Sequence, residues 1–463
     1  MHATSFKGMT LRILHRRWAV LYSAFYTNFV SYGIRFGYGI LLPAMTESLN
    51  LTAAQAGLIV SAYFISYTIF SFITGALTDR MSARKVITLF CIPLGIGATL
   101  MGTVMEQWNA CIFYALVGVG ASACWTPVAT LVQRWFSAKR RGMALGIVTT
   151  GYAWGYGTMG LVLPILVSSY GWRTCWYILG AMAFSLVAVN GILVKDSPEG
   201  TKPKARSSES VIEPLKNARP PAKTKYSEVA SASEFWLIGM SYLMIAAAQF
   251  VLTTFLVSYA TFELSIRYED AATLASVSAF AGIPGALIFA TLSDYVGRSK
   301  ILFVCNVIVA VSFLSVALIG LTIPALMVIV AIWGFFNAGI WPIYAACAPE
   351  YFSKALAGTV LGLWTIYYGV GATIGPAVAG YLAHISKTFF WSFILAALLA
   401  AASAVFVFLI PQREQGKHNL DHSCAFSNKK RETHTEAKFQ PTWHGIVSDL
   451  PVIEFMLRRF LLK

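Results

Sequence analysis

Charged residues are scarce in this chain of 463 residues, and long apolar stretches take their place. Only 12% of the residues are Asp, Glu, Lys or Arg and 57% are apolar, whereas soluble domains average roughly 25% charged residues. This composition excludes a soluble enzyme, a nucleic-acid-binding domain and a disordered scaffold. A membrane β-barrel is disfavoured too, because barrel strands alternate polar and apolar residues and these stretches are continuously apolar.

Cysteine and histidine patterns of catalytic or metal sites are also missing. The seven cysteines form no CxxC or other metal-ligand spacing. Six of them lie in or at the edge of apolar stretches, where cysteine packs as a small apolar residue. The seven histidines lie outside the centres of these stretches. We therefore expect no metal, no cofactor and no enzymatic activity.

Twelve apolar stretches are long enough to cross a bilayer, which takes about 20 residues of helix. We expect an all-α, multi-pass membrane protein of the cytoplasmic or plasma membrane with twelve transmembrane helices. The expected spans are 18–43, 53–77, 86–105, 109–132, 142–168, 174–194, 235–262, 271–293, 301–321, 323–347, 355–383 and 388–410.

The excess of basic residues has a topological explanation. The chain has 35 Lys and Arg against 20 Asp and Glu, a net charge of +15. Nearly all basic residues lie on the side of the N-terminus, and the other side carries only Arg173, Arg267 and Lys387. By the positive-inside rule, both termini are therefore expected in the cytoplasm, and no nucleic acid is needed to explain the charge.

The sequence repeats itself at a steady distance. Asp294 lies 215 positions after Asp79, and Trp341 and Tyr368 lie 216 positions after Trp125 and Tyr152. This register predicts two parallel six-helix halves, 18–194 and 235–410. A cytoplasmic linker rich in Lys, Glu, Ser and Pro joins them at 195–234, and cytoplasmic tails cover 1–17 and 411–463.

The loops after the second and eighth spans carry the most specific motif. They resemble the G-x-x-x-D-R-x-G-x-R-K loops of the major facilitator superfamily, although Ser82 and Ala290 replace two of the usual glycines. The resemblance covers about 18–410 and implies two six-helix halves around a central site. It also implies a conformational latch that holds the outward-open state through charge-assisted bonds. The latch residues are Gly75, Asp79, Arg80, Arg84, Lys85, Asp294, Gly297, Arg298 and Lys300.

Arg35 is the only Asp, Glu, Lys or Arg within the twelve expected spans. An ionisable residue inside the membrane is a functional hypothesis, because burying its charge is costly. A planar, permanently charged donor suits a carboxylate or phosphate, and organic-anion transporters of the superfamily place an arginine at a similar point. The alternative is a structural role, because Arg35 lies 17 residues after Trp18 and could snorkel to the interface.

Aromatic and amide side chains are expected to complete the substrate site. Tyr32 and Tyr38 stand near Arg35 at helical spacing, and Gln249 lies almost opposite Arg35 by the repeat. Tyr and Trp offer an apolar wall with a polar tip, although core packing is an alternative for each of them. The remaining candidates are Trp125, Tyr152, Asn337, Trp341, Tyr344, Trp364, Tyr367 and Tyr368.

The junction 134–147 and the run 171–173 are similar to the monocarboxylate and oxalate/formate branches of the superfamily. The charged pair of monocarboxylate transporters is missing from 271–293, and Tyr367 stands where oxalate transporters carry a lysine. With one fixed positive charge left, a singly charged organic acid fits better than a dicarboxylate. No central acid or histidine is present for proton coupling, so a proton travelling with the substrate and anion exchange both stay open.

We therefore predict a monomeric secondary transporter for a small organic anion that works by alternating access. Two other functions stay open. One is efflux of neutral metabolites or drugs, although the G-x-x-x-G-P motif of drug antiporters is missing from 142–168. The other is a transporter-like sensor that signals through its long tail, whose last residues, 451–463, form a basic amphipathic segment.

Overall fold

A computed structural model describes residues 2–136, 138–196, 229, 231–318, 322–352 and 356–411. Side chains are described from Arg16 onward within these ranges, apart from those of Asp79, Ala138 and Lys139. Most of the expected linker and all of the expected tail beyond Pro411, including its amphipathic segment, lie outside the described residues. The chain up to Pro411 forms one compact unit.

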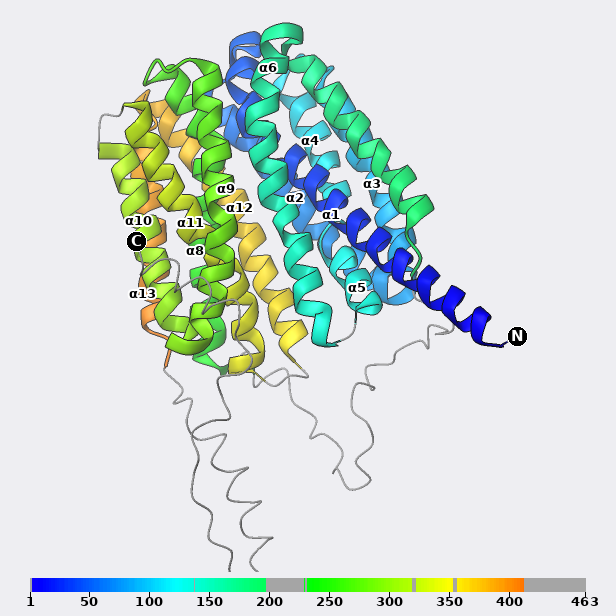
Figure 1. The fold of residues 1–463 in the computed structure, drawn as a ribbon. Coiled ribbons are helices and arrows are strands. Elements are labelled where there is room, and N and C mark those ends of the chain that lie inside the picture. The colour runs from blue at the N-terminus through cyan, green and yellow to red at the C-terminus, as the bar shows by residue number, and fades with distance from the viewer. Residues whose placement is uncertain are drawn as a thin grey trace, which may run out of the picture. The chain divides into compact units, whose positions relative to one another are not determined.

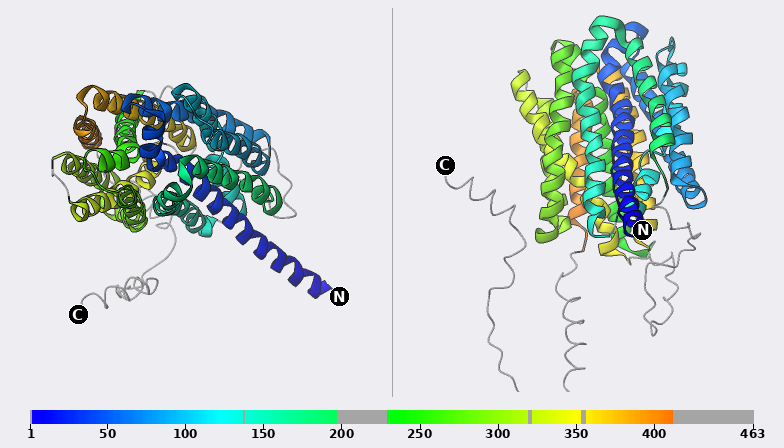
Figure 2. Two further views of the ribbon diagram at one scale, coloured as in Figure 1. Left: turned by 90° about the horizontal axis from the view of Figure 1, so that it is seen from above. Right: turned by 45° about the vertical axis from the view of Figure 1, so that its right-hand side comes forward.

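The described residues form helices joined by short connections (Figure 1). The first turns of α1 extend away from the neighbouring helices (Figure 2, left). The helices are α1 (His2–Leu49), α2 (Ala53–Arg80), α3 (Ala83–Met101), α4 (Gln107–Ala121), α5 (Thr126–Trp135), α6 (Ala138–Leu193), α8 (Ser233–Phe262), α9 (Tyr268–Val296), α10 (Arg298–Leu318), α11 (Ile323–Tyr351), α12 (Ala357–Ser386) and α13 (Phe390–Phe408).

Nine segments of the described chain are long and apolar enough to cross a membrane. α1 and α12 have the length but are not among the nine. The nine segments are 53–78, 83–101, 107–135, 140–193, 233–262, 268–296, 298–318, 323–351 and 390–408.

One expected span is interrupted. The expected single span 109–132 is broken, because α4 ends at Ala121 and α5 begins only at Thr126. Pro127 at the start of α5 has no N–H to continue a helical ladder. The spans expected at 142–168 and 174–194 correspond to the two helical parts of α6, which are separated by a kink at Gly171. The positive φ of 78° at this residue suits glycine.

Helices α1–α6 form one set and α8–α13 form another, and we call these the N-set and the C-set. The most extensive contacts between the two sets are those of α2 with α12, α6 with α9, and α1 with α8. The repeat relates the first two pairs to each other, since α2 corresponds to α9 and α12 to the first part of α6. Figure 1 shows the N-set in blue to teal beside the C-set in green to orange.

The two sets touch mainly toward one end of the bundle. We call it the upper end; there α1 passes to α2, α6 bends at Gly171 and α12 passes to α13 (top of Figure 1). A Cβ placed on Gly57 would lie 2.2 Å from the Pro376 carbonyl oxygen, so backbones touch at this point. At the opposite, lower end, a Cβ on Gly75 or Gly358 would meet nothing within 4 Å. The contact is therefore polarised along the bundle.

Candidate functional site

Arg35 lies inside the bundle on α1 and has no carboxylate partner among the described residues. Its side chain is 7% exposed, and its Nε donates a hydrogen bond to Tyr63 Oη at 2.7 Å. None of the ion pairs among the described residues involves Arg35. A buried charge without an ionic partner is costly unless other groups stabilise it, so the surroundings of this guanidinium decide its role.

Aromatic rings from α1 and α2 surround the guanidinium. The guanidinium carbon lies 4.7 Å from the Tyr32 ring centre and 4.6 Å from that of Tyr67. The rings of Tyr63 and Phe64 follow at 5.4 and 5.7 Å. Ring faces stabilise a cation at such distances. We call these four residues the aromatic cage of Arg35.

The cage leaves hydrogen-bonding capacity unused. The partners of the Arg35 side chain are tyrosine hydroxyls, Tyr63 at Nε and Tyr32 beside the guanidinium, and neither carries a charge. The two terminal nitrogens supply four N–H groups in all. These nitrogens form the edge that binds planar anions bidentately. Tyr114 Oη donates to the Arg35 carbonyl oxygen at 2.8 Å, a bond that fixes the backbone and leaves the guanidinium free. The arrangement can therefore accept a carboxylate or a similar anion at its edge.

The C-set supplies the opposite wall of the site. Phe250 on α8 stacks on Phe36 with ring centres 6.1 Å apart, and it lies 4.3 Å from Phe64 of the cage. Tyr368 on α12 lies 6.5 Å from Phe64 and 5.8 Å from Phe250. The aromatic cage thus lies where both sets meet.

Gln249 lies at the level of Arg35. Phe36 faces Phe250, and a Cβ on Gly39 would lie 2.1 Å from the Thr253 carbonyl oxygen. α1 and α8 therefore run in the same direction here. Arg35 lies about one helical turn before Gly39, and Gln249 lies about one turn before Thr253, so the two residues are at the same level. Gln249 is 3% exposed, and its Oε1 has no hydrogen-bond partner among the described residues.

Leaving a buried amide oxygen unpaired costs about 1–3 kcal/mol. Asn337 is 2% exposed, and its Oδ1 also has no hydrogen-bond partner among the described residues. Both residues belong to the C-set, and both were expected at the site from the sequence.

Two further candidates join the cage through ring contacts. Tyr152 lies edge-on to Tyr32 at 5.3 Å, and Trp341 packs edge-on against Tyr368 at 5.5 Å. The structure therefore brings together four of the sequence candidates around Arg35, with Gln249 at the same level. These four are Tyr32, Tyr152, Trp341 and Tyr368.

Other candidates lie apart from the cage. Tyr38 Oη donates to the Ala56 carbonyl at 2.9 Å, and Trp364 Nε1 donates to the Phe235 carbonyl at 3.0 Å. The Tyr344 hydroxyl pairs with Ser241 within the C-set. Two more candidates complete this group: Tyr367, which packs on Phe235 and Trp236, and Trp125, which is 37% exposed in the turn between α4 and α5.

Sequence reasoning missed the part of the cage that α2 contributes. Tyr63, Phe64 and Tyr67 lie on one face of this helix, and only the fold shows that this face meets Arg35. Phe250 could have been found, because it lies 215 positions after Arg35 and is its repeat equivalent.

The two latch loops differ in detail. In the second, Arg298 lies 3.3 Å from Asp294 and 2.6 Å from Glu350, and Gly297 adopts a φ of 105°. Its equivalent Ser82 has a φ of −71° and caps α3, which explains why serine is tolerated there.

In the first loop, the Arg84 amide donates to Asp196 at 3.0 Å. The Asp79 side chain lies outside the described residues. Arg80, Lys85 and Lys300 are exposed, and Gly75 meets no neighbouring atom within 4 Å of a Cβ position.

A sequence profile of the Major Facilitator Superfamily matches residues 24–287 and 238–462. The chain belongs to the major facilitator superfamily. This facilitator is 23% identical over 400 residues to the probable sulfoacetate transporter SauU of Cupriavidus necator, with 83% of this chain and 91% of the relative covered. It is 25% identical to the hexuronate transporter of Bacillus subtilis, with 85% and 94% covered.

Two further relatives are a monocarboxylate transporter and a membrane sensor. Monocarboxylate transporter 13 of Rattus norvegicus is 23% identical to this facilitator, with 85% of this chain and 88% of the relative covered. The membrane sensor protein UhpC of Salmonella typhimurium is 24% identical, with 82% and 88% covered.

The fold agrees with solved facilitator structures. A bacterial homologue of the human lysosomal transporter Spinster, solved inward-facing and occupied, superimposes with a TM-score of 0.69 at 16% identity. The match covers 85% of this chain and 96% of the other. This facilitator is therefore an integral membrane protein, and its relatives imply a small-molecule substrate rather than an enzymatic reaction.

Proposed function

We propose that this facilitator is a secondary transporter that moves a small, singly charged organic anion of the monocarboxylate type. It crosses the cytoplasmic or plasma membrane twelve times, as two halves at 18–194 and 235–410, and acts as a monomer. The concentration of Lys and Arg on the side of the N-terminus supports a cytoplasmic location of the lower end and of both termini.

The observation that carries this proposal is the environment of Arg35. The guanidinium is buried and surrounded by rings. It forms no ion pair with a carboxylate of the described residues. The unused edge binds the carboxylate of the substrate, while Phe250 and Tyr368 contact its apolar body. Gln249 contributes a neutral polar contact from the opposite side. A second negative charge on the substrate would have no fixed cation in the expected spans to pair with.

Polarised contact between the sets supports alternating access. If the lower end is cytoplasmic, closure at the upper end corresponds to an inward-open state. The outward-open state would then require the upper contacts to break and the lower ends to meet, with the loops of Asp79 and Asp294 as the latch. Binding of substrate to groups from both sets couples occupancy to this movement.

Flux of radiolabelled monocarboxylates into proteoliposomes tests the proposal. Arg35→Gln should lose transport and substrate-induced thermal stabilisation while remaining folded. Arg267→Gln is the matched control, because Arg267 is 75% exposed and its ion pairs are with Glu269 and Asp270. Unchanged affinity in Arg35→Gln would assign Arg35 a structural role and sink the assignment.

A sensor function is the second candidate, and it is favoured by the similarity to UhpC and by the length of the tail. A sensor would bind the anion without moving it. Binding with no flux in the same proteoliposomes would support this function. Stabilisation by neutral or cationic compounds alone would instead support efflux. Flux measured with and without a pH gradient separates proton coupling from anion exchange.

A further inference from the structure

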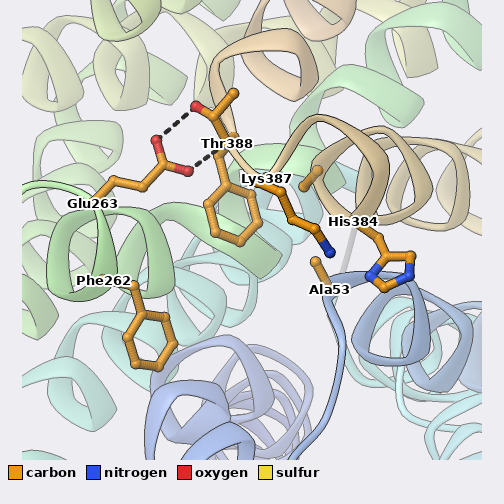
Figure 3. A pocket seen from close by; sticks show the side chains of 8 residues that line it. Ala53, Phe262, Glu263, His384, Lys387 and Thr388 are labelled. Carbon is orange, nitrogen blue, oxygen red and sulfur yellow. Dashed lines mark hydrogen bonds between the residues drawn. The ribbon is translucent and has the colours of Figure 1, made fainter.

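A cavity lies at the upper end, away from Arg35. It has a volume of about 270 Å³ and is lined by Ala53, Phe262, Glu263, Ala383, His384, Lys387, Thr388 and Phe389. A second cavity of about 170 Å³ adjoins it and shares Ala53, Phe262 and Phe389. We call the first the outer chamber and the second the inner chamber. Figure 3 shows the outer chamber with Lys387 directed toward Ala53.

The outer chamber contains one lysine, one glutamate and one histidine, and the glutamate has its own partners. Glu263 accepts hydrogen bonds from Thr388 Oγ1 at 2.9 Å and from the Phe389 amide, at the beginning of α13 (Figure 3). Its charge is therefore bound to a helix N-terminus, which stabilises an anion. Lys387 and His384 take part in none of the ion pairs among the described residues. Within the described part of the chain, Lys387 therefore offers an ammonium group without an ion-pair partner, in the same chamber as the His384 imidazole.

The inner chamber is apolar. Leu42, Ala56 and Phe255 line it, and each is at most 2% exposed to solvent. Its polar groups are the hydroxyls of Thr46 and Ser258, and Ser258 Oγ has no hydrogen-bond partner among the described residues. A cationic mouth above an apolar interior is complementary to a molecule with an anionic head and a short hydrocarbon chain.

We propose that these two chambers form a binding site for a medium-chain aliphatic carboxylate, distinct from the site at Arg35. The carboxylate pairs with Lys387, His384 supplies a hydrogen bond to it, and the chain fills the inner chamber. This ligand is an inhibitor of the transport cycle rather than its substrate.

Inhibition follows from the origin of the chamber walls. Leu42, Thr46, Ala53 and Ala56 come from α1 and α2, whereas the other lining residues come from α8, α12 and the start of α13. The site therefore joins the N-set to the C-set and exists only while the upper end is closed. A ligand that binds one of two conformations shifts the population toward it, so this carboxylate holds the facilitator with its upper end closed.

Binding of a homologous series from butyrate to decanoate to the purified full-length Arg35→Gln variant tests the site without interference from the substrate site. Affinity should rise with chain length, by at most about fourfold per methylene, until the inner chamber is full. Lys387→Asn should weaken binding at least tenfold, and asparagine tolerates the positive φ of 59° found there. Arg267→Gln, at the same end, is the matched control and should bind normally.

A second variant tests the chain-binding part. Ser258→Leu places a larger apolar side chain in the inner chamber and should remove the gain of affinity beyond butyrate. Equal affinity across the series, or no effect of Lys387→Asn, would overturn the proposal. The proposal would also be overturned if phosphatidylglycerol from added vesicles occupied the two chambers and the protein then no longer bound carboxylates.

The inference and the proposed function can fail separately. Binding to the Arg35→Gln variant requires only the two chambers, whereas flux requires Arg35. In the wild-type facilitator, octanoate should slow flux, and Lys387→Asn should relieve that inhibition without changing uninhibited flux. Octanoate that is transported in wild type and no longer binds to Arg35→Gln would show that it is a substrate, and the second site would be refuted.

Discussion

Ser61 and Ser276 make the same hydrogen bond from equivalent positions of the sequence repeat. Ser61 Oγ on α2 donates to the Thr373 carbonyl on α12 at 2.6 Å. Ser276 Oγ, 215 positions later on α9, donates to the Gly157 carbonyl on α6 at 2.7 Å. Thr373 and Gly157 are themselves 216 positions apart. The N-set and the C-set are therefore joined at the upper end by two symmetry-related bonds.

Removing these hydroxyls should weaken closure of the upper end. Ser61→Ala and Ser276→Ala each lose one hydrogen bond between the sets, worth about 0.5–1.5 kcal/mol, and the double variant should lose about twice as much because the sites are far apart. Distance measurements between spin labels at positions 50 and 386 should show a larger population of open upper ends. Ser168→Ala is the control, because Ser168 bonds only within α6. Identical distance distributions in all variants would contradict the prediction.

Tyr63 should contribute to anion affinity through its hydroxyl. Tyr63→Phe keeps the ring beside the guanidinium but removes the acceptor of the Arg35 Nε bond. The guanidinium then loses one fixed contact, and substrate affinity should fall by about threefold to tenfold. Calorimetric titration checks this result. Tyr177→Phe makes the same chemical change at a hydroxyl that bonds Gly102, and should leave affinity unchanged.

The sequence predicted the centre of the site better than its walls. Arg35 was identifiable because a lone charge inside an apolar span is costly in any membrane fold, and the repeat pointed to Gln249. The contribution of α2 was not identifiable, because Tyr63 and Tyr67 are ordinary span residues until the packing of α2 against α1 is known. The sequence also did not show that the Trp364 indole bonds the Phe235 carbonyl, because no sequence pattern reveals such a backbone contact.

The fold shows the same limit. Hydropathy located the apolar stretches, but it did not show that α4 and α5 are separated by a turn, because Trp125 and its neighbours are as apolar as a helix interior. The kink at Gly171 lies between two stretches that the sequence had already separated, but its positive φ was visible only in the structure. Local backbone geometry was therefore the part that required coordinates.

Gln249→Glu should abolish anion binding more completely than Gln249→Leu. A carboxylate at the level of Arg35 would pair with the guanidinium and occupy the edge that the substrate uses. We expect at least a tenfold loss of affinity for Gln249→Glu and a smaller loss, below tenfold, for Gln249→Leu. Fluorescence-based thermal shift with the substrate provides the measurement. Gln133→Glu adds the same charge at an exposed position and is the control. A glutamate variant that binds the anion as well as wild type does would place Gln249 outside the site.

Gly57 should be required for closure of the upper end. A Cβ at Gly57 would lie 2.2 Å from the Pro376 carbonyl oxygen, a distance that only movement of a backbone relieves. Gly57→Ala should therefore force α2 and α12 apart and favour the state with an open upper end, so that net flux falls while the protein stays folded. Gly146→Ala on α6 is the control, because a Cβ there meets nothing within 4 Å. The change in state should appear as increased labelling of a cysteine placed at position 53, which lies between the sets. Wild-type flux and wild-type labelling in Gly57→Ala would show that this close approach is not needed for transport.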